Sequence, residues 1–256
     1  MNIAVSGASG FIGRHVVAEL EGRRLPVSLL ARGMHALPGR PDALIHLAWG
    51  GLPNYKSLHH FEQELPAQYA LLKGLVEAGL KTLVVAGTCF EYGMQSGPLS
   101  EVMAAQPANP YGLAKDTLRR QLEQLQRQTP FALNWARLFY LHGDGQAANS
   151  LWPQLQSAVA RGEASFPMSG GEQLRDYLPV TEVAKHLVDL ALAQRDSGII
   201  NVCSGRPISV RRLVEGWVAH NGWAIYLDLG RYPYPDHEPM AFWGDDRKLR
   251  RCLSPQ

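Results

Sequence analysis

The sequence predicts an α/β fold in which helices cover both faces of a doubly wound parallel sheet. Two observations indicate it. Short apolar segments alternate along the chain with longer segments whose apolar residues recur at helical spacing. The first apolar segment also runs directly into a glycine-rich turn that opens a helix. Strands buried on both faces of a parallel sheet have such short, continuous apolar sequences.

The expected elements follow this alternation in order. Strands are predicted at residues 2–6, 27–31, 43–48, 82–86, 133–139 and 198–202. Helices are predicted after the glycine turn and at residues 61–78, 110–128, 183–193 and 210–220. Each strand is therefore paired with a helix that can cross over to the next one, except between residues 32 and 43, where only ten residues intervene.

The density of Gly, Pro, Asn and Ser rises beyond Tyr140, which indicates a smaller and less regular region. We therefore expect a dinucleotide-binding core at residues 1–142, to which residues 176–203 return. A smaller C-terminal substrate-binding lobe is expected at residues 143–175 and 204–256.

Composition excludes several classes of protein. The chain has 256 residues, a formal net charge of +2 and 46% hydrophobic residues, which is typical of a globular protein without a nucleic-acid-binding stripe. Its apolar runs are far shorter than the roughly 20 residues that span a membrane, and no export signal precedes the first strand. We expect a cytoplasmic protein that binds neither nucleic acid nor membrane. Cys89, Cys203 and Cys252 are widely spaced, which predicts free thiols and no metal site.

The glycine turn carries the first functional signal. Gly7, Gly10 and Gly13 lie between a strand and a helix, where backbone N–H groups and the helix N-terminus can bind a pyrophosphate. This context predicts a Rossmann-type dinucleotide site. The alternative is a tight strand-to-helix turn that binds no ligand.

The end of the second strand bears on the choice of dinucleotide. An acidic residue there binds the ribose hydroxyl of NAD, whereas an arginine favours the 2′-phosphate of NADP. Ala31 and Arg32 occupy this place, and Arg14 can assist from the first helix. The sequence thus favours NADP(H), with NAD(H) possible. Arg32 as a solvated loop residue is the alternative.

A tyrosine and a lysine four residues apart share one helix face, where the ammonium can lower the pKa of the phenol and prepare it for proton transfer. Tyr111 and Lys115 match this spacing, and so do Tyr69 and Lys73. Tyr111 follows Asn109 and Pro110, which signal a helix start, whereas Tyr69 lies within an apolar helix. We therefore predict that the first pair works in catalysis and that the second is structural.

The chain resembles the extended short-chain dehydrogenase/reductases, the NAD(P)-dependent epimerase/dehydratase group that acts on nucleotide sugars. The resemblance rests on motifs in the family's order: GASGFIG at residues 7–13, HLA at 46–48, GTCFEYG at 87–93, PYGLAK at 110–115 and RDYLPVTEVA at 175–184. Within the group, the chain looks most like enzymes that act on nucleotide-linked 4-keto-6-deoxyhexoses, such as dTDP-fucose, 6-deoxytalose and CDP-abequose synthases.

The resemblance implies a role for each matched residue. Thr88 would hydrogen-bond the reacting oxygen, Tyr111 would be the acid/base, and Lys115 would hold the nicotinamide ribose. The implied cofactor-binding residues are Gly7, Ser9, Gly10, Phe11, Ile12, Gly13, Arg32, Leu47, Ala48, Trp49, Tyr111, Lys115 and Leu138. The implied substrate-binding residues are Thr88, Cys89, Phe90, Tyr140, Asn149 and Arg175, with Arg175 on the diphosphate. Cys89 and Glu91 line the sugar pocket or fill the core, and His46 is read as a strand residue.

The chain departs from the family's pattern in three places, one of which is the absence of a basic residue often found near the PYP segment, where Pro235 and His237 stand. The short link between Arg32 and Ala43 lacks the usual third strand and helix, and with them the acidic residue that contacts adenine. Tyr140 stands where sugar epimerases commonly have an asparagine, so the grip on the nucleotide would rest on Arg175, Asn149 and Arg231.

Three hypotheses follow. The first is an NADP(H)-dependent reductase of the C4 carbonyl of a nucleotide-diphospho-4-keto-6-deoxyhexose, with Tyr111 as the proton donor. The second keeps the site but makes the protein a nucleotide-sugar 4-epimerase or an NAD-dependent nucleotide-sugar dehydrogenase. The third is a non-catalytic dinucleotide-binding sensor, which the presence of both Tyr111 and Lys115 argues against. By analogy with the family, we expect a homodimer formed through the helices at 61–78 and 110–128.

Overall fold

The computed structural model describes residues 1–34, 36, 39–235 and 238–254. Its centre is a six-stranded sheet in which every pairing is parallel. From one edge to the other the strands are β11 (Gly198–Val202), β6 (Ala132–Leu138), β4 (Thr82–Thr88), β3 (Ala43–His46), β1 (Ile3–Ser6) and β2 (Val27–Leu30). The sheet confirms the predicted fold class.

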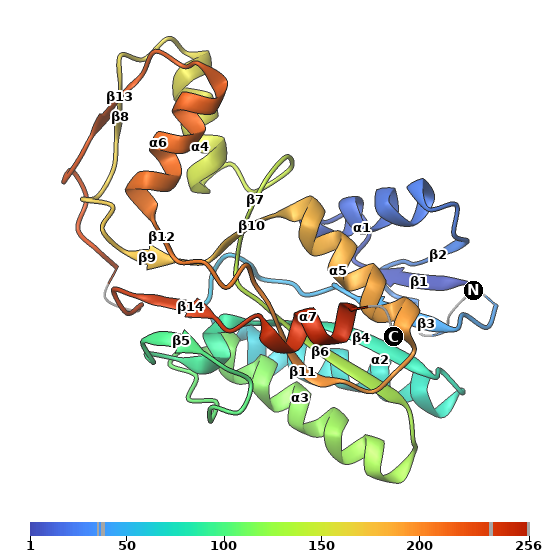
Figure 1. Cartoon of the computed structure of the whole chain (residues 1–256). Helices are drawn as coiled ribbons and strands as arrows, with labels where there is room; N and C mark the ends of the chain where they lie inside the picture. Colours follow the sequence, from blue (N-terminus) through green and yellow to red (C-terminus); the bar gives the residue numbers. More distant parts are fainter. Residues whose placement is uncertain (35, 37–38, 236–237, 255–256) are drawn as a thin grey trace.

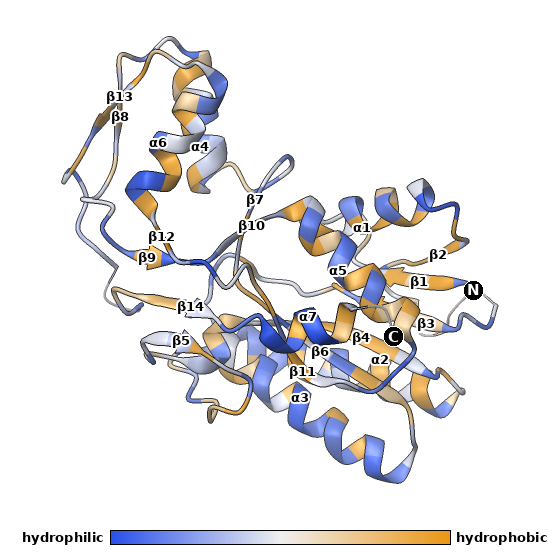
Figure 2. Ribbon diagram, in the orientation of Figure 1, coloured by the Kyte–Doolittle hydropathy of each residue, from blue (hydrophilic) through white to orange (hydrophobic). Residues whose placement is uncertain are grey.

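Helices cover both faces of the sheet (Figure 1). On one face α1 (Phe11–Gly22) packs beside α5 (Val180–Ala193), and on the other α2 (Leu65–Glu77) packs beside α3 (Pro110–Gln128). Alternate residues of β4 serve the two faces: Val84 belongs to the apolar cluster under α1 and α5, whereas Leu83 and Val85 belong to that under α2 and α3. In Figure 2 the central strands are largely apolar and much of α3 is hydrophilic, as its outward face requires.

The predicted strands and helices are found at nearly the expected places, and two regions differ in detail. β4 continues to Thr88, two residues beyond the predicted end. Residues 31–42 connect β2 to β3, and those that the structure describes form no helix or strand. Twelve residues are about the minimum for a parallel crossover, so this side of the sheet lacks the layer that an additional strand and helix would provide.

The smaller lobe projects from the carboxyl-terminal side of the sheet (Figure 1). It contains α4 (Leu151–Ala160), α6 (Val210–Asn221) and the paired strands β8 (Ser165–Pro167) and β13 (Tyr226–Asp228), around an apolar cluster that includes Leu155 and Phe166. Two further pairs tie it to the core: β7 (Tyr140–His142) with β10 (Tyr177–Pro179), and β9 (Leu174–Arg175) with β12 (Ile208–Ser209).

The C-terminal segment packs on the core within the range that we assigned to the lobe. β14 (Phe242–Gly244) pairs with β5 (Gly97–Leu99), and α7 (Arg247–Leu253) contacts β11 and α5. Among the described residues, no helix is long and apolar enough to cross a membrane.

Candidate active site

The glycine turn lies between β1 and α1, where a dinucleotide would bind. Gly7 adopts a φ of +70°, and a Cβ there would lie 2.8 Å from the backbone nitrogen of Ala48. A Cβ on Gly13 would overlap the carbonyl oxygen of Gly7. Gly10 caps the helix without a side-chain hydrogen bond. The turn thus fits a pyrophosphate, because close packing keeps side chains away and the first N–H groups of α1 have no side-chain cap.

The other residues expected at the cofactor lie around the same end of the sheet. Ser9 and Gly10 are exposed, and Phe11 and Ile12 begin α1 half-buried. Leu47, Ala48 and Trp49 follow β3, and the backbone nitrogen of Leu47 donates to Ser6 Oγ at 3.2 Å. Leu138 ends β6. Arg32 is exposed just beyond the end of β2. Carboxyl ends of neighbouring parallel strands form the crevice in which such sheets bind ligands.

Tyr111 is fixed at the first turn of α3. Pro110 occupies the first helical position, and the Asn109 side chain caps the helix by accepting from the backbone nitrogen of Gly112 at 2.8 Å. The backbone nitrogen of Tyr111 donates to the carbonyl oxygen of Tyr55 at 3.2 Å. The loop after β3 therefore supplies the partner for one of the free N–H groups of this helix end.

Aromatic rings surround Tyr111, whose residue is 8% exposed. The ring centroids of His60, Tyr55 and Trp49 lie 5.3, 5.5 and 6.0 Å from that of Tyr111. Burial raises the pKa of Tyr111 well above its ordinary value, and a hydrogen bond with the Thr88 side chain acts in the opposite direction. The phenol therefore keeps its proton at neutral pH in this state.

Lys115 lies one helical turn below Tyr111. Its Nζ donates to the carbonyl oxygen of Ala86 at 2.9 Å and lies 3.9 Å from the centroid of the Trp49 ring. Burial lowers the pKa of Lys115 to about 7, although Glu91 and Glu64 act to raise it. The expected lowering of the Tyr111 pKa by Lys115 is wrong for this state, because both groups are buried and loss of water dominates each of them.

Thr88 ends β4 beside this pair. Its Oγ1 accepts from the backbone nitrogen of Phe90 at 3.3 Å, and its backbone nitrogen donates to Glu91 Oε1 at 2.9 Å. These two bonds form a reciprocal cap on the short 3₁₀ helix Cys89–Tyr92. The structure thus brings Thr88, Tyr111 and Lys115 together where β4 ends.

Glu91 and Cys89 point to the interior, the second of the two alternatives for them. Glu91 is fully buried and accepts from Trp135 Nε1 and from Arg137 Nε at 2.6 Å. Cys89 belongs to an apolar cluster with Tyr92, and burial raises the pKa of its thiol. Of the GTCFEYG segment, Phe90 and Gly93 are half-buried, and the Phe90 ring lies 4.9 Å from that of Tyr55.

The predicted diphosphate ligand Arg175 is 2% exposed and already engaged. Its Nη2 donates to Glu238 Oε2 at 2.9 Å and its Nη1 to the carbonyl oxygen of Leu174 at 2.9 Å. The guanidinium carbon lies 5.8 Å from the ring centroid of Tyr140, and burial raises the pKa of that phenol well above its ordinary value. Asn149 is an exposed residue before α4, and its carbonyl oxygen accepts from Gln154 Nε2 at 2.6 Å.

Sequence reasoning missed Tyr55, His60 and Glu238. His60 is fully buried; its Nδ1 accepts from Trp49 Nε1 at 3.1 Å, and its Nε2 donates to the carbonyl oxygen of Asn54 at 2.9 Å. His60 is thus a neutral imidazole that ties together the loop over Tyr111. No spacing rule relates such loop residues to a helix 50 positions away, but the density of aromatic and His residues after HLA was a usable signal.

The second Tyr/Lys pair makes structural contacts on α2. Tyr69 packs against the apolar cluster under α2 and α3. Lys73 is exposed and forms an ion pair with Glu77 at 3.7 Å. His46 lies on β3, fully buried, and burial lowers its pKa to about 3.

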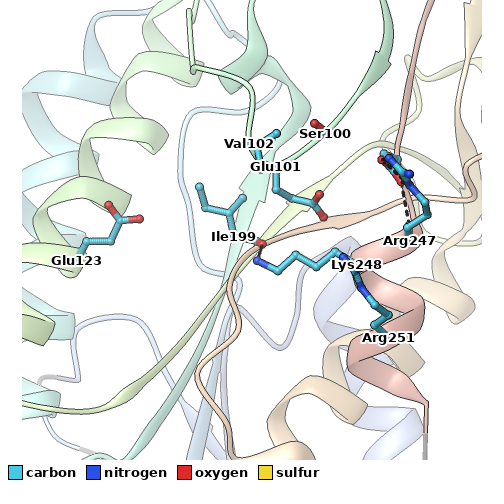
Figure 3. A pocket seen from close by; sticks show the side chains of 9 residues that line it. Ser100, Glu101, Val102, Glu123, Ile199, Arg247, Lys248 and Arg251 are labelled. Carbon is cyan, nitrogen blue, oxygen red and sulfur yellow. Dashed lines mark hydrogen bonds and ion pairs between the residues drawn. The ribbon is translucent and has the colours of Figure 1, made fainter.

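A pocket of about 490 Å³ lies elsewhere, between α7 and the turn after β5 (Figure 3). It contains none of the residues expected at the cofactor or substrate. Two of its three cationic side chains have partners: Arg247 pairs with Asp245, and Lys248 Nζ donates to the carbonyl oxygen of Ile199 at 2.6 Å. The pocket therefore adds nothing to the crevice site. The three cysteines are free thiols, and in the described part of the chain no three His, Cys, Asp or Glu side chains are placed to hold a metal ion.

Known sequences resemble this chain over most of its length. The sequence profile of the "NAD dependent epimerase/dehydratase family" matches residues 3–203. The chain is 31% identical to a dTDP-6-deoxy-L-talose 4-dehydrogenase (NAD(+)) of Aggregatibacter actinomycetemcomitans, over 95% of this chain and 99% of that protein. It is 24% identical to UDP-arabinose 4-epimerase 1 of Arabidopsis thaliana, over 99% of this chain and 74% of that protein.

Solved structures show the same fold. MoeE5 in complex with UDP-glucose and NAD is 26% identical, with a TM-score of 0.80 over 99% of this chain and 92% of that one. RMD from Pseudomonas aeruginosa, solved with NADPH, is 22% identical with a TM-score of 0.85 over 98% and 92% of the two chains. At that identity the likeness concerns the fold alone.

Proposed function

Because this chain belongs to the NAD dependent epimerase/dehydratase family, we propose that it is a nicotinamide-dependent reductase acting at C4 of a nucleotide-linked 4-keto-6-deoxyhexose. The observation that carries the proposal is the convergence of Thr88, Tyr111 and Lys115 at the carboxyl end of β4. The 31% identity to a dTDP-6-deoxy-L-talose 4-dehydrogenase supports the sugar class and the C4 position.

The residues of the chain account for the proton side of the reaction. The dinucleotide, when bound, supplies or removes a hydride. Tyr111, whose raised pKa keeps the phenol protonated, donates its proton to the C4 oxygen as that oxygen gains charge. Thr88 Oγ1 would donate a second hydrogen bond to the same oxygen, and Lys115 would contact the dinucleotide ribose.

Arg175 is proposed to bind the diphosphate of the substrate. Its planar guanidinium can donate two parallel hydrogen bonds to phosphate oxygens, and its carbonyl partner Leu174 fixes its orientation. The carboxylate of Glu238 holds the same guanidinium in this structure. Substrate binding would replace the Glu238 carboxylate by the diphosphate as the anionic partner of Arg175. Binding of the remote diphosphate in this way would orient the sugar ring toward Tyr111.

NADP(H) is the proposed cofactor because no acidic residue stands at the end of β2, where Ala31 and Arg32 are exposed. The NAD(+) in the name of the bacterial relative makes NAD(H) the competing choice. Titration of the purified protein with NADPH, NADP, NADH and NAD decides between them. A preference for NADPH that Arg32→Ala removes would support our choice; equal or tighter binding of NADH would reject it.

The activity is tested with a dTDP-4-keto-6-deoxyhexose and each reduced dinucleotide, by following the loss of absorbance at the nicotinamide band and identifying the sugar product. A C4 alcohol formed with one equivalent of dinucleotide consumed would support the proposal. Binding of dinucleotide without consumption of any 4-keto sugar nucleotide would reject it.

A 4-epimerase is the second candidate, favoured by the similarity to UDP-arabinose 4-epimerase 1. An epimerase keeps its dinucleotide through the reaction. Purified protein that already carries about one NAD per chain, and that interconverts two sugar nucleotides without added cofactor, would favour it over the reductase.

A homodimer through α2 and α3 is proposed for either enzyme, to be tested by the mass of the protein in solution.

A further inference from the structure

A buried network centred on Glu91 reaches the catalytic crevice. Glu91 Oε1 accepts from the backbone nitrogen of Thr88 at 2.9 Å and from Trp135 Nε1 at 2.9 Å. Glu91 Oε2 accepts from Arg137 Nε at 2.6 Å. Glu91 and Arg137 are 0% and 1% exposed. A carboxylate so far from water thus joins β4, β6 and the turn that carries Thr88.

The same network leaves no freedom at the end of β4. A Cβ on Gly87 would lie 2.7 Å from Glu91 Oε1 and within overlap of Trp135 Nε1. The carboxylate is therefore packed against the backbone of residue 87 as well as bonded to that of residue 88. Any shift of the Thr88 backbone must break a hydrogen bond or move a buried charge.

Further charged side chains connect this network to α3. Arg137 Nη2 lies 3.9 Å from Asp116 Oδ1, and Asp116 follows Lys115 in the sequence. Asp116 in turn accepts from Arg119 Nη2 at 2.6 Å. Both segments that supply catalytic side chains, the end of β4 and the start of α3, are thus attached to one chain of buried ion pairs.

Stability alone is a poor reason for this arrangement. A buried ion pair is often no more stabilising than apolar side chains of similar volume, since both ions lose their water. What an apolar pair could not supply is an acceptor for the Thr88 backbone nitrogen. The need for an acceptor at the Thr88 backbone nitrogen therefore accounts for a carboxylate at this buried position.

We propose that Glu91, held by Arg137, is a positioning residue that fixes Thr88 against the reacting oxygen. The proposal rests on the proposed function, since it assumes that Thr88 binds that oxygen. Glu91 itself does not contact the substrate; it acts through the Thr88 backbone.

Glu91→Gln tests this. All three partners of the carboxylate are donors, so the amide group of glutamine must oppose one of them. We expect kcat to fall by about tenfold or more, as small displacements of a catalytic group do, with the KM of the sugar nucleotide within about threefold of wild type. The decisive measurement is a cycle with Thr88→Val: the double variant should have the kcat of Thr88→Val within about threefold.

Tyr92→Phe is the matched control. It removes another buried hydrogen bond of the same turn, from Tyr92 Oη to Asn201 Oδ1 at 2.7 Å, together with the contact of that hydroxyl with Arg137. It keeps the ring that lies 4.4 Å from the Arg137 guanidinium carbon and leaves the bond from the Thr88 nitrogen to Glu91 in place. General loosening of the turn would lower kcat in Tyr92→Phe as much as in Glu91→Gln, and that result would overturn the proposal. If the fold reductions in kcat of Glu91→Gln and Thr88→Val multiply in the double variant, the proposal would also be overturned.

A second readout is independent of turnover. Hydrogen exchange of the Thr88 amide should accelerate at least about tenfold in Glu91→Gln and change little in Tyr92→Phe. If wild type reduces no 4-keto sugar nucleotide, the proposed function fails, and unchanged exchange at Thr88 would separately reject the positioning role. If Glu91→Gln does not fold, Arg137→Lys removes the Nε donor while keeping the charge, and the same faster exchange is expected.

Discussion

The ammonium of Lys115 lies 3.9 Å from the centroid of the Trp49 ring, which covers it from the side of the loop after β3. One carbonyl oxygen, that of Ala86, is its hydrogen-bond acceptor at 2.9 Å. An aromatic face and a single carbonyl replace only part of the water that an ammonium loses on burial. The charged form of Lys115 is therefore destabilised, which is why its pKa falls to about 7.

Lys115→Met should change how stability depends on pH. The unfolded chain keeps the Lys115 proton up to its ordinary pKa of 10.5, whereas the folded protein releases it near pH 7. Between these values the unfolded state binds more protons, so this residue makes the free energy of unfolding rise with pH. We expect the free energy of unfolding of the wild type, relative to that of Lys115→Met, to rise by about 1 kcal/mol per pH unit between pH 7 and 9. Urea unfolding of both proteins measures it.

Well below pH 7 the difference in free energy of unfolding between wild type and Lys115→Met should be constant, because Lys115 is then charged in both the folded and the unfolded chain. A flat difference across the whole range would contradict the low pKa. Lys73→Met, on the exposed face of α2, controls for the loss of one positive charge.

Tyr111→Phe should lower kcat by roughly 10²- to 10⁴-fold, since it removes the group that gives the proton to the C4 oxygen. The dinucleotide Kd should stay within about twofold of wild type. Steady-state turnover and a dinucleotide titration measure the two effects. Tyr69→Phe, in the pair with the same spacing, should keep the wild-type kcat; a loss there equal to that in Tyr111→Phe would reverse our assignment of the two pairs.

Gly13→Ala should weaken dinucleotide binding by more than about tenfold. Its Cβ would overlap the carbonyl oxygen of Gly7, so the turn must open at the place where the pyrophosphate binds. Gly22→Ala, at the last position of the same helix, meets no atom within 4 Å and should leave binding unchanged while adding about 0.5 to 1 kcal/mol of stability. Kd from fluorescence titration separates the two variants, and equal affinities in both would show that the turn does not bind the dinucleotide.

Local signals allowed most of the fold and the catalytic group to be predicted. The glycine turn, the Asn109-Pro110 helix start and the apolar strands each act within a few residues, so the sequence displays them directly. The strand at Ala43–His46 was predicted for the same reason.

Contacts between distant segments were not predictable in this way. Glu238 meets Arg175 across 63 positions, and Tyr55 reaches the backbone of Tyr111 from a loop without periodic pattern. The Tyr/Lys spacing correctly suggested a shared helix face. The pKa of Tyr111, however, is raised by burial and not lowered as expected, because spacing does not show how much water each group loses.

Arg175→Lys should raise the KM of the sugar nucleotide about tenfold or more while leaving the dinucleotide Kd unchanged. The guanidinium donates at once to Glu238 and to the carbonyl oxygen of Leu174, an arrangement in which one arm is fixed by the backbone and the other faces an anion. A lysine keeps the charge but has no planar fork, so it cannot present two oriented N–H groups to a diphosphate. Initial rates at varied sugar nucleotide, with NADPH saturating, measure the change. If KM stays at the wild-type value while kcat falls, Arg175 does not bind the diphosphate, and its pairing with Glu238 serves to hold the segment before β14 against the lobe.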